Sequence, residues 1–475
     1  MLTRIAASAA TAAASRPRAR AFASLLARDH YKHPELPQFV VGTENGFLPR
    51  QDPLPTLPAE FKELESLLQR MPLTVKSGAK GLLATGDFGA AVNAELPEYN
   101  VDGIHDTQLL TALFRDYTFA ASAYLLEPCD LFFRDKKDYG LGRSVLPRNI
   151  AVPLSKVSAK IGARPFMEYA QSYSLFNFHR VDKNRGLDYD NLELIRQFSG
   201  MPSEHGFILV HVAMVAHSGN QVKHILGALE AAERNDRTRF DQELRGLLSA
   251  MQSINRVMDT MWAHSAPEDY AKFRTFIMGT KNQPMFPNGV IYEGVSDEPT
   301  FYRGESGAND SIIPSADNFL ELTAELPENP LTEILRDFRS YRPTNHNEWL
   351  AWLEKQARQV NIREFSLANS SSAVLYLALL DQVREFRARH WNFTKEYIIK
   401  YSTHPVATGG SPITTWLPNQ LDTVLRVMEL TSKHIHLDKV SPADQGLAKQ
   451  LIDRAEAQRR VLTREVAALR QQFNQ

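Results

Sequence analysis

Hydrophobic residues recur with helical spacing along most of the chain after Pro58, and this pattern restricts the fold more than any other feature of the sequence. We expect helices over residues 59–70, 106–127, 155–178, 206–232, 239–263, 267–280, 317–326, 331–339, 346–358, 370–402, 417–437 and 441–472. Strand-like alternation is scarce, and the apolar run FILVHVAMVA continues with helical spacing to Glu230. The sequence therefore predicts an all-α protein.

A polar segment and a long irregular stretch organise these helices. The segment DKNRGLDYDN predicts a boundary near 180–200, between a small helical domain (31–195) and a larger one (196–440), with a charged C-terminal helix in 441–475. Residues 281–317 contain eight glycines and prolines and no clear periodicity. Loops of this length without periodicity are uncommon and often functional, and this one lies in the larger domain.

Charge and cysteine content exclude several classes of function. Lys and Arg total 54 and Asp and Glu total 55, so the basic excess of a nucleic-acid-binding protein is missing. The single cysteine, Cys129, excludes an intrachain disulfide, a cysteine-based zinc site and an iron–sulfur cluster. No window approaches 18 consecutive apolar residues, so we predict no transmembrane segment.

The first 30 residues differ from the rest of the chain. They are rich in Ala, Ser and Arg and contain no acidic residue before Asp29. This composition is typical of an organellar presequence, and a disordered basic tail is the alternative. We expect an intracellular protein that is mitochondrial if this segment directs import and cytoplasmic otherwise.

One histidine lies within an apolar helical stripe of the segment 370–402. The stripe runs through Val383, Phe386, His390, Phe393 and Tyr397. A histidine in such a position is most often a hydrogen-bonded core residue. It could also be the axial ligand of a haem, which needs one imidazole from a rigid element among apolar and aromatic side chains.

A second helix and a short one supply further candidates. Phe207 and His211 share one face of the segment 206–232, either as core residues or as the wall of a pocket. Arg274 has apolar neighbours, so it needs an anion, which could be a protein carboxylate or a ligand carboxylate. The glycine-containing loops around Ser306 and over 407–411 could approach a ligand closely, with surface turns as the alternative.

Six segments, in this order, resemble the indoleamine 2,3-dioxygenase family. They are VLPRNIAVP (145–153), GVIYEG (289–294), RGESGANDSIIPSAD (303–317), YRPTNH (341–346), FRARHWNFTKEYI (386–398) and ATGGS (407–411). The similarity extends over roughly residues 30–435. It implies a two-domain, all-α fold with haem b in the large domain.

The resemblance also implies roles for individual residues. His390 matches the proximal iron ligand, Arg274 the residue that binds the substrate carboxylate, and Phe207 the aromatic against the indole ring. Ser306 matches the serine of the loop on the distal side of the haem. The loop that closes over the amino-acid end of the substrate is matched by Thr408, Gly409 and Gly410.

Two positions depart from the family pattern. His211 stands where some members have serine, and it resembles the distal histidine of tryptophan 2,3-dioxygenases. Asp269 stands where many members have a pocket phenylalanine; it could pair with Arg274 and compete with the substrate, or Tyr270 could fill that space.

The activity that the resemblance implies is the insertion of both atoms of O2 into the indole C2=C3 bond of L-tryptophan. The product is N-formylkynurenine, the first intermediate of the kynurenine pathway of tryptophan catabolism. We expect a monomer that needs an electron donor to keep its iron ferrous. The alternative is a haem-binding member of the family with weak tryptophan activity, which acts on another indole or as a haem sensor.

Overall fold

The computed structural model describes residue 33 and residues 35–325, 337–401 and 413–472, and helices dominate this part of the chain. The α-helices are α3 (Lys62–Arg70), α4 (Leu82–Thr85), α5 (Phe88–Glu95), α6 (Thr107–Lys136), α7 (Arg148–Ile161), α8 (Pro202–Val215), α9 (Ser218–Glu233), α10 (Arg237–Asp259), α11 (Met261–His264), α12 (Pro267–Arg274), α13 (Ile312–Phe319), α15 (Thr344–Val360), α16 (Ile362–Leu367), α17 (Ser370–Phe393), α18 (Ile413–Ser432) and α19 (Pro442–Gln472). The prediction of an all-α protein is confirmed.

Short helical turns and two small sheets complete the described structure. The turns are η2 (Ala59–Phe61), the π-helical η3 (Tyr169–Tyr173), η4 (Tyr189–Asn191), η5 (Thr275–Ile277), η6 (Gly307–Asn309), η7 (Leu322–Glu325), the π-helical η8 (Thr394–Ile398), η9 (Ile399–Tyr401) and η10 (Leu437–Lys439). Strand β1 (Val145–Leu146) pairs in parallel with β4 (Ile291–Tyr292). Strand β2 (Phe178–Arg180) pairs in antiparallel fashion with β3 (Leu192–Leu194).

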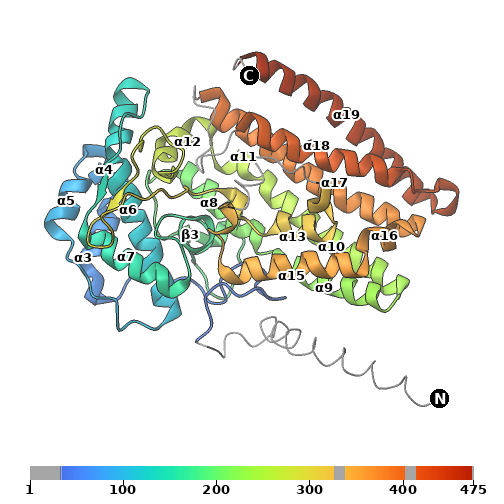
Figure 1. Cartoon of the computed structure of the whole chain (residues 1–475), viewed down its shortest axis with the longest axis horizontal. Coiled ribbons are helices and arrows are strands. Elements are labelled where there is room, and N and C mark those ends of the chain that lie inside the picture. The colour runs from blue at the N-terminus through green and yellow to red at the C-terminus, as the bar shows by residue number, and fades with distance from the viewer. Residues whose placement is uncertain (1–32, 34, 326–336, 402–412, 473–475) are drawn as a thin grey trace.

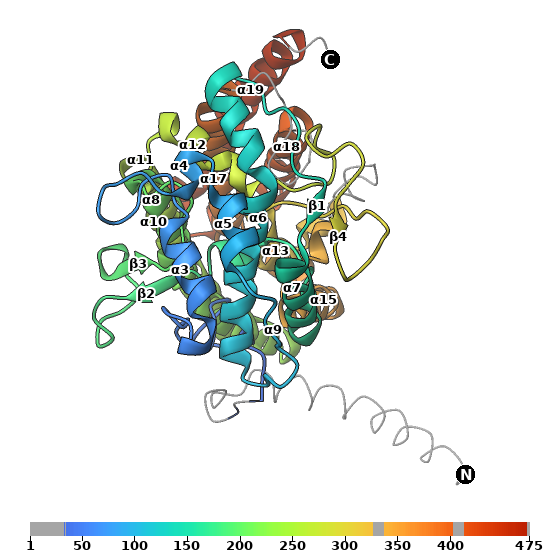
Figure 2. The ribbon, with the colours of Figure 1, turned by 90° about the vertical axis from the view of Figure 1, so that its left-hand side faces the viewer.

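The early and late helices form opposite halves of an elongated molecule. Helices α3 to α7 gather at one end and α15 to α19 at the other, with α8 and α12 between them (Figure 1). Turned by 90°, the view shows the β2–β3 hairpin projecting on the side away from β1 and β4 (Figure 2). The polar segment 182–191 forms the loop of this hairpin. The division into two domains stays a prediction.

Helix α17 lies in the interior of the C-terminal half. Every residue from Ser372 to Arg384 is buried, so this part of the helix is covered on all its faces. Helices α10, α18 and α19 pack against it. A helix buried on all sides is held by its neighbours in one position, which suits an element that carries a ligand.

Several expected helices differ from the observed ones, and one observed helix was not expected. The predicted helix 155–178 is wrong: α7 begins at Arg148 and ends where Gly162 adopts a left-handed conformation with φ 71°. The predicted helix 206–232 is divided into α8 and α9 at Ala216 and His217. The apolar spacing continues across this break, so periodicity alone did not show it. Helix α16 was not expected at all.

Several predictions fall outside the described residues. These are the presequence of residues 1–30, the first part of the expected helix 331–339, and the loop with Thr408, Gly409 and Gly410. Within the described ranges, no helix combines the length and the apolar character needed to cross a membrane.

Candidate active site

Helix α8 places Phe207 and His211 one turn apart on one face. Their ring centroids are 5.8 Å apart. The start of the helix is fixed by the buried Glu204, whose carboxylate accepts hydrogen bonds from the backbone N–H groups of Phe198 and Ser199. Pro202 occupies the first turn, where its missing N–H costs no hydrogen bond. The predicted shared face of Phe207 and His211 is therefore confirmed.

The imidazole of His211 is oriented by a tyrosine from the π-helical turn η3. The hydroxyl of Tyr169 lies 3.2 Å from Nδ1 of His211, and the two rings meet edge to face at 5.7 Å. The side chain of Glu168 caps this turn by accepting from the backbone N–H of Gln171. Because Tyr169 is buried and the turn is capped, the hydroxyl has a defined direction toward His211.

Two histidines lie deep in the protein within electrostatic reach of each other. Burial lowers the pKa of His390 to about 4. Burial also lowers the pKa of His211 to about 4, and the charge of His390 adds to this effect. Both residues nevertheless keep part of their surface accessible. Both imidazoles are neutral at pH 7, which is the form that binds a metal.

His390 occupies the last turn of α17 before the helix changes its winding. The α-helix ends at Phe393 and the π-helical turn η8 follows it directly. Within the described part of the chain, the His390 side chain makes no hydrogen bond. A core histidine normally has such a partner, so His390 departs from the usual pattern within this part of the chain.

Arg274 ends helix α12, next to α8 and η8. It is buried, and its guanidinium group interacts with the hydroxyls of Tyr139 and Tyr270. The ring of Tyr270 lies 5.3 Å from that of Phe207. Helix α12 packs against both α8 and η8. The guanidinium, the Phe207 ring and the end of α17 are thus brought together.

Asp269 does not pair with Arg274. Its carboxylate accepts from Ser203 Oγ at 2.6 Å and forms an ion pair with Lys272 Nζ at 2.7 Å. Tyr270 is the buried residue of this turn and packs against Phe207. At this position Tyr270 is the residue directed toward Phe207, and the expected pairing of Asp269 with Arg274 is not seen.

The loop around Ser306 runs beside both α8 and η5. The backbone N–H of Glu305 donates to the carbonyl of Ile277 at 3.1 Å. A methyl group on Gly307 would lie 3.9 Å from Cε1 of His211. The Ser306 hydroxyl accepts from the backbone N–H of Ala308 and caps the turn η6. The structure therefore brings this loop to the His211 side of the site.

Close approach of two backbone segments explains a glycine in this loop. A Cβ on Gly304 would lie 2.3 Å from the backbone nitrogen of Gly279 and 2.5 Å from the carbonyl oxygen of Ile277. Any larger residue at position 304 would push the loop away from η5. Farther along, Arg342 donates to the carbonyl of Ala308 at 2.8 Å and holds the end of the loop.

The sequence analysis missed two residues of this site. Tyr169 and Tyr139 reach His211 and Arg274 from elements far away in the sequence. Tyr169 belongs to an aromatic-rich segment, but no spacing rule connects it with a histidine 42 positions later. The proposed closing residues Thr408, Gly409 and Gly410 lie outside the described residues.

The described residues fit a haem. His390 is a neutral imidazole near the end of a well-packed helix, and it makes no competing hydrogen bond among the described residues. Aromatic rings lie beside His211: the ring of Phe207 is 5.8 Å from its imidazole and 5.6 Å from the ring of Phe273. The imidazole of His211 is the second neutral one, within electrostatic reach of His390.

Comparison with known proteins gives a family and several relatives. The model of the family described as indoleamine 2,3-dioxygenase matches residues 35–430. The chain is 27% identical over 355 residues to indoleamine 2,3-dioxygenase 1 of Mus musculus, an alignment that covers 74% of this chain and 81% of the relative. It is 30% identical over 258 residues to indoleamine 2,3-dioxygenase 2 of Homo sapiens, with coverage of 54% and 62%. It is also 25% identical over 375 residues to a myoglobin of Haliotis madaka, with coverage of 78% and 90%.

Proposed function

The chain belongs to the indoleamine 2,3-dioxygenase family, and on this premise we propose that it is a haem-dependent dioxygenase that converts L-tryptophan and O2 into N-formylkynurenine. One observation carries the proposal. It is a neutral imidazole on α17 within electrostatic reach of a second one on α8, which contacts the ring of Phe207; that ring in turn packs against Tyr270, a partner of Arg274. These are the groups needed for a haem and an indole amino acid.

His390 would hold haem b through its imidazole. The haem, kept reduced by an electron donor, would supply the iron chemistry for O2. The contribution of α17 is to present the imidazole from a helix that neighbouring helices fix on all sides. The low pKa of His390 keeps Nε2 and Nδ1 free of a second proton across the physiological pH range.

Arg274 and Phe207 would position the substrate. A buried guanidinium recognises a carboxylate through two parallel hydrogen bonds, and the hydroxyls of Tyr139 and Tyr270 hold Arg274 in place. The ring of Phe207, on α8, would make apolar contact with the indole ring of the substrate. Thr408, Gly409 and Gly410 would close over the amino-acid end of the substrate. Fixing both ends of the substrate places the indole double bond for reaction and excludes water.

His211 would act on the distal side, together with the loop of Ser306. When the Tyr169 hydroxyl donates to Nδ1, the ring proton resides on Nε2, and the imidazole then presents an N–H donor. Ser306 lies in the loop that passes beside His211, and its hydroxyl already caps η6. We therefore propose that His211 donates a hydrogen bond to the reacting groups and holds a proton there. Ser306 supports the backbone of the loop.

Turnover of L-tryptophan by the reconstituted, reduced protein tests the proposal. We expect the ultraviolet absorbance of N-formylkynurenine to appear at wavelengths where tryptophan does not absorb, in proportion to O2 consumed. Arg274→Ala should raise the KM for L-tryptophan. Haem-loaded protein that binds O2 but forms no N-formylkynurenine at any tryptophan concentration would refute it.

A second function is supported by the relative that carries the name myoglobin rather than that of an enzyme. In that case the protein would bind haem through His390 but turn over tryptophan feebly, act on another indole, or respond to haem as a sensor. The turnover assay separates the two candidates, because the first one forms N-formylkynurenine as its main reaction and the second one forms it only slowly.

Location and oligomeric state stay predictions. We propose that the basic segment of residues 1–30 directs import into mitochondria, and that the protein acts in the cytoplasm without it. We also propose that the protein is a monomer.

A further inference from the structure

The C-terminal helix α19 lies along α18 and also reaches α17 (Figure 1). The family model ends its match at residue 430, so α19 lies beyond the part of the chain that defines the family. Residues Leu451, Ala455 and Leu462 are buried, which shows that the helix is packed against the protein over much of its length. The charged tail seen in the sequence is therefore a folded part of the C-terminal half.

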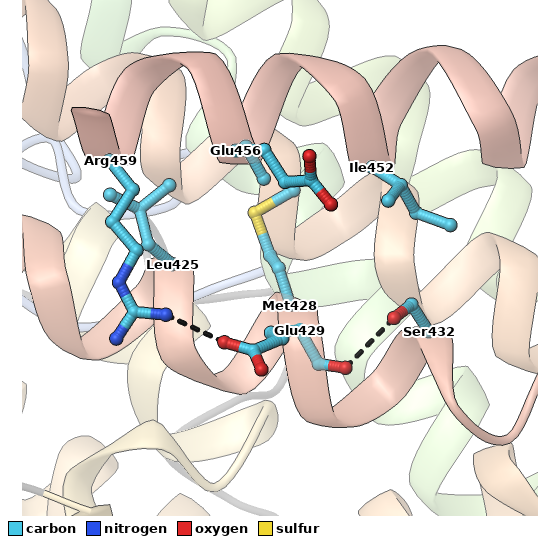
Figure 3. Close-up of a pocket in the computed structure, with 8 residues that line it drawn as sticks. Leu425, Met428, Glu429, Ser432, Ile452, Glu456 and Arg459 are labelled. Carbon is cyan, nitrogen blue, oxygen red and sulfur yellow. Dashed lines mark hydrogen bonds and ion pairs between the residues drawn. The ribbon is translucent and has the colours of Figure 1, made fainter. Parts of the chain in front are cut away.

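The contact between α18 and α19 is peripheral and partly open. A cavity of about 250 Å³ separates the two helices, and its lining includes Leu425, Met428 and Ile452. Arg459 Nη1 bridges it to Glu429 at 2.6 Å (Figure 3). Both members of this ion pair are about half exposed, so the pair contributes little to stability.

The contact between α17 and α19 is different, because it reaches the turn that carries His390. Trp391 follows His390 directly, and only 1% of its surface is exposed. Its indole Nε1 donates to Oε2 of Glu465 on α19 at 2.8 Å. The other oxygen of the same carboxylate, Oε1, accepts from Lys395 Nζ at 2.6 Å.

Glu465 thus holds both sides of the junction at which α17 becomes π-helical. Trp391 belongs to the last α-helical turn, and Lys395 belongs to η8. Such π-helical segments are rare and energetically poor in isolation, so they need contacts that maintain them. If the segment relaxed to α-helical winding, the relative direction of His390 and of the η8 residues would change.

A second anchor holds the same two helices farther from the junction. The buried carboxylate of Asp381 on α17 accepts from Arg384 at 2.6 Å and from Arg454 of α19 at 2.8 Å. Docking of α19 therefore does not depend on Glu465 alone. This separation makes it possible to remove the contact at the junction without releasing the whole helix.

We propose that Glu465 of α19 is a positioning residue for the haem site: it fixes the orientation of the His390 turn through Trp391 and Lys395. The proposal rests on the proposed role of His390 as a haem ligand. Through this contact a helix outside the family region acts on the proximal side of the site. Supporting groups of this kind tune ligands even though they do not touch the metal.

The test compares Glu465→Ala, Glu465→Gln and Trp391→Phe in the full-length haem-loaded protein. Glu465→Ala leaves a buried N–H without an acceptor, and we expect haem to dissociate about tenfold faster. In the reduced protein, the iron–histidine stretching band should shift or broaden. Glu465→Gln keeps an acceptor for Trp391 Nε1 and should restore most of the wild-type behaviour. Trp391→Phe removes the donor of the same hydrogen bond, and it is the variant to use if Glu465→Ala does not fold.

The matched control is Arg459→Gln, which removes an ion pair between α19 and α18 away from His390. It should leave the stretching band and the haem dissociation rate unchanged. The contrary outcome is that Glu465→Ala and Trp391→Phe lower the midpoint of unfolding and yet keep the wild-type iron–histidine stretching band and haem dissociation rate. In that case α19 merely stabilises the fold and the proposal is wrong. Wild-type protein that takes up no haem would instead overturn the proposed function, and this inference with it.

Discussion

Replacing Arg274 by alanine tests how the substrate is held. The guanidinium is buried with 3% of its residue surface exposed, and it would form two charge-assisted hydrogen bonds with the substrate carboxylate. Each such bond contributes about 1.5–3 kcal/mol. Because Tyr139 and Tyr270 remain as donors near the vacated position, we take the lower end, about 3 kcal/mol in total.

A loss of about 3 kcal/mol corresponds to a rise in the KM for L-tryptophan of roughly 10²-fold, because 1.4 kcal/mol changes a binding constant tenfold. The assay is steady-state formation of N-formylkynurenine over a range of tryptophan concentrations. Tryptamine, which lacks the carboxylate, should bind to the wild type and to Arg274→Ala with equal affinity, measured by its effect on the haem spectrum.

Asp269→Asn is the matched control on the same helix. Asp269 pairs with Lys272 and Ser203, so its replacement should change the KM for tryptophan by less than about threefold, as expected for a partly exposed ion pair. The reasoning fails if Arg274→Ala keeps the wild-type KM. It also fails if Asp269→Asn alters the KM as strongly as Arg274→Ala does.

Three further predictions follow from the contacts around the site. Tyr169→Phe removes the hydroxyl that orients His211, and kcat should fall by about three- to tenfold, the equivalent of one hydrogen bond, with unchanged haem content. Burial lowers the pKa of His346 to about 3 in the folded protein. As the pH falls below about 6.5, this histidine therefore binds a proton in the unfolded chain but not in the folded one, which favours unfolding. This histidine should therefore make the haem-free protein about 2 kcal/mol less stable at pH 5 than at pH 7, and denaturant titrations of His346→Phe should show that much less pH dependence. Gly304→Ala forces a methyl group against backbone atoms of Gly279 and Ile277, so thermal unfolding should reveal a loss of about 1–3 kcal/mol; an unchanged midpoint would contradict the close approach of the two segments.

The sequence was a good guide to elements with long, regular periodicity and a poor one to their interruptions. Helices α17 and α19 were expected close to where they occur, and α6 was expected at its start but not to its end at Lys136; apolar residues recur along each of them. The break between α8 and α9 was not expected, since the apolar pattern runs through it. A tertiary contact lies at this break: Ser218, at the start of α9, accepts a hydrogen bond from the backbone N–H of Phe47, far away in the sequence.

The candidate site was predicted in the same uneven way. Spacing placed Phe207 and His211 on one face, which the structure confirms. Spacing could not decide whether His390 was a ligand or a core residue, and its role as a ligand stays a prediction; the structure adds that the residue lies within electrostatic reach of His211. Tyr169 and Tyr139 could not be found, because their contacts with the site join distant segments. The sequence could not show whether Asp269 or its neighbour Tyr270 points inward, because a shift of one residue in the helix exchanges the two. In the structure Tyr270 is buried and Asp269 pairs with Lys272.

The central claim is that His390 binds a haem next to a tryptophan site, and an absorption titration tests it most directly. Purified full-length protein would be reconstituted with haem, reduced, and titrated with L-tryptophan, with His390→Ala in parallel. We predict a Soret band typical of histidine-ligated haem that shifts with saturation as tryptophan is added, and little or no bound haem in His390→Ala. Equal haem binding by His390→Ala, or a Soret band that tryptophan does not alter at any concentration, would contradict the account.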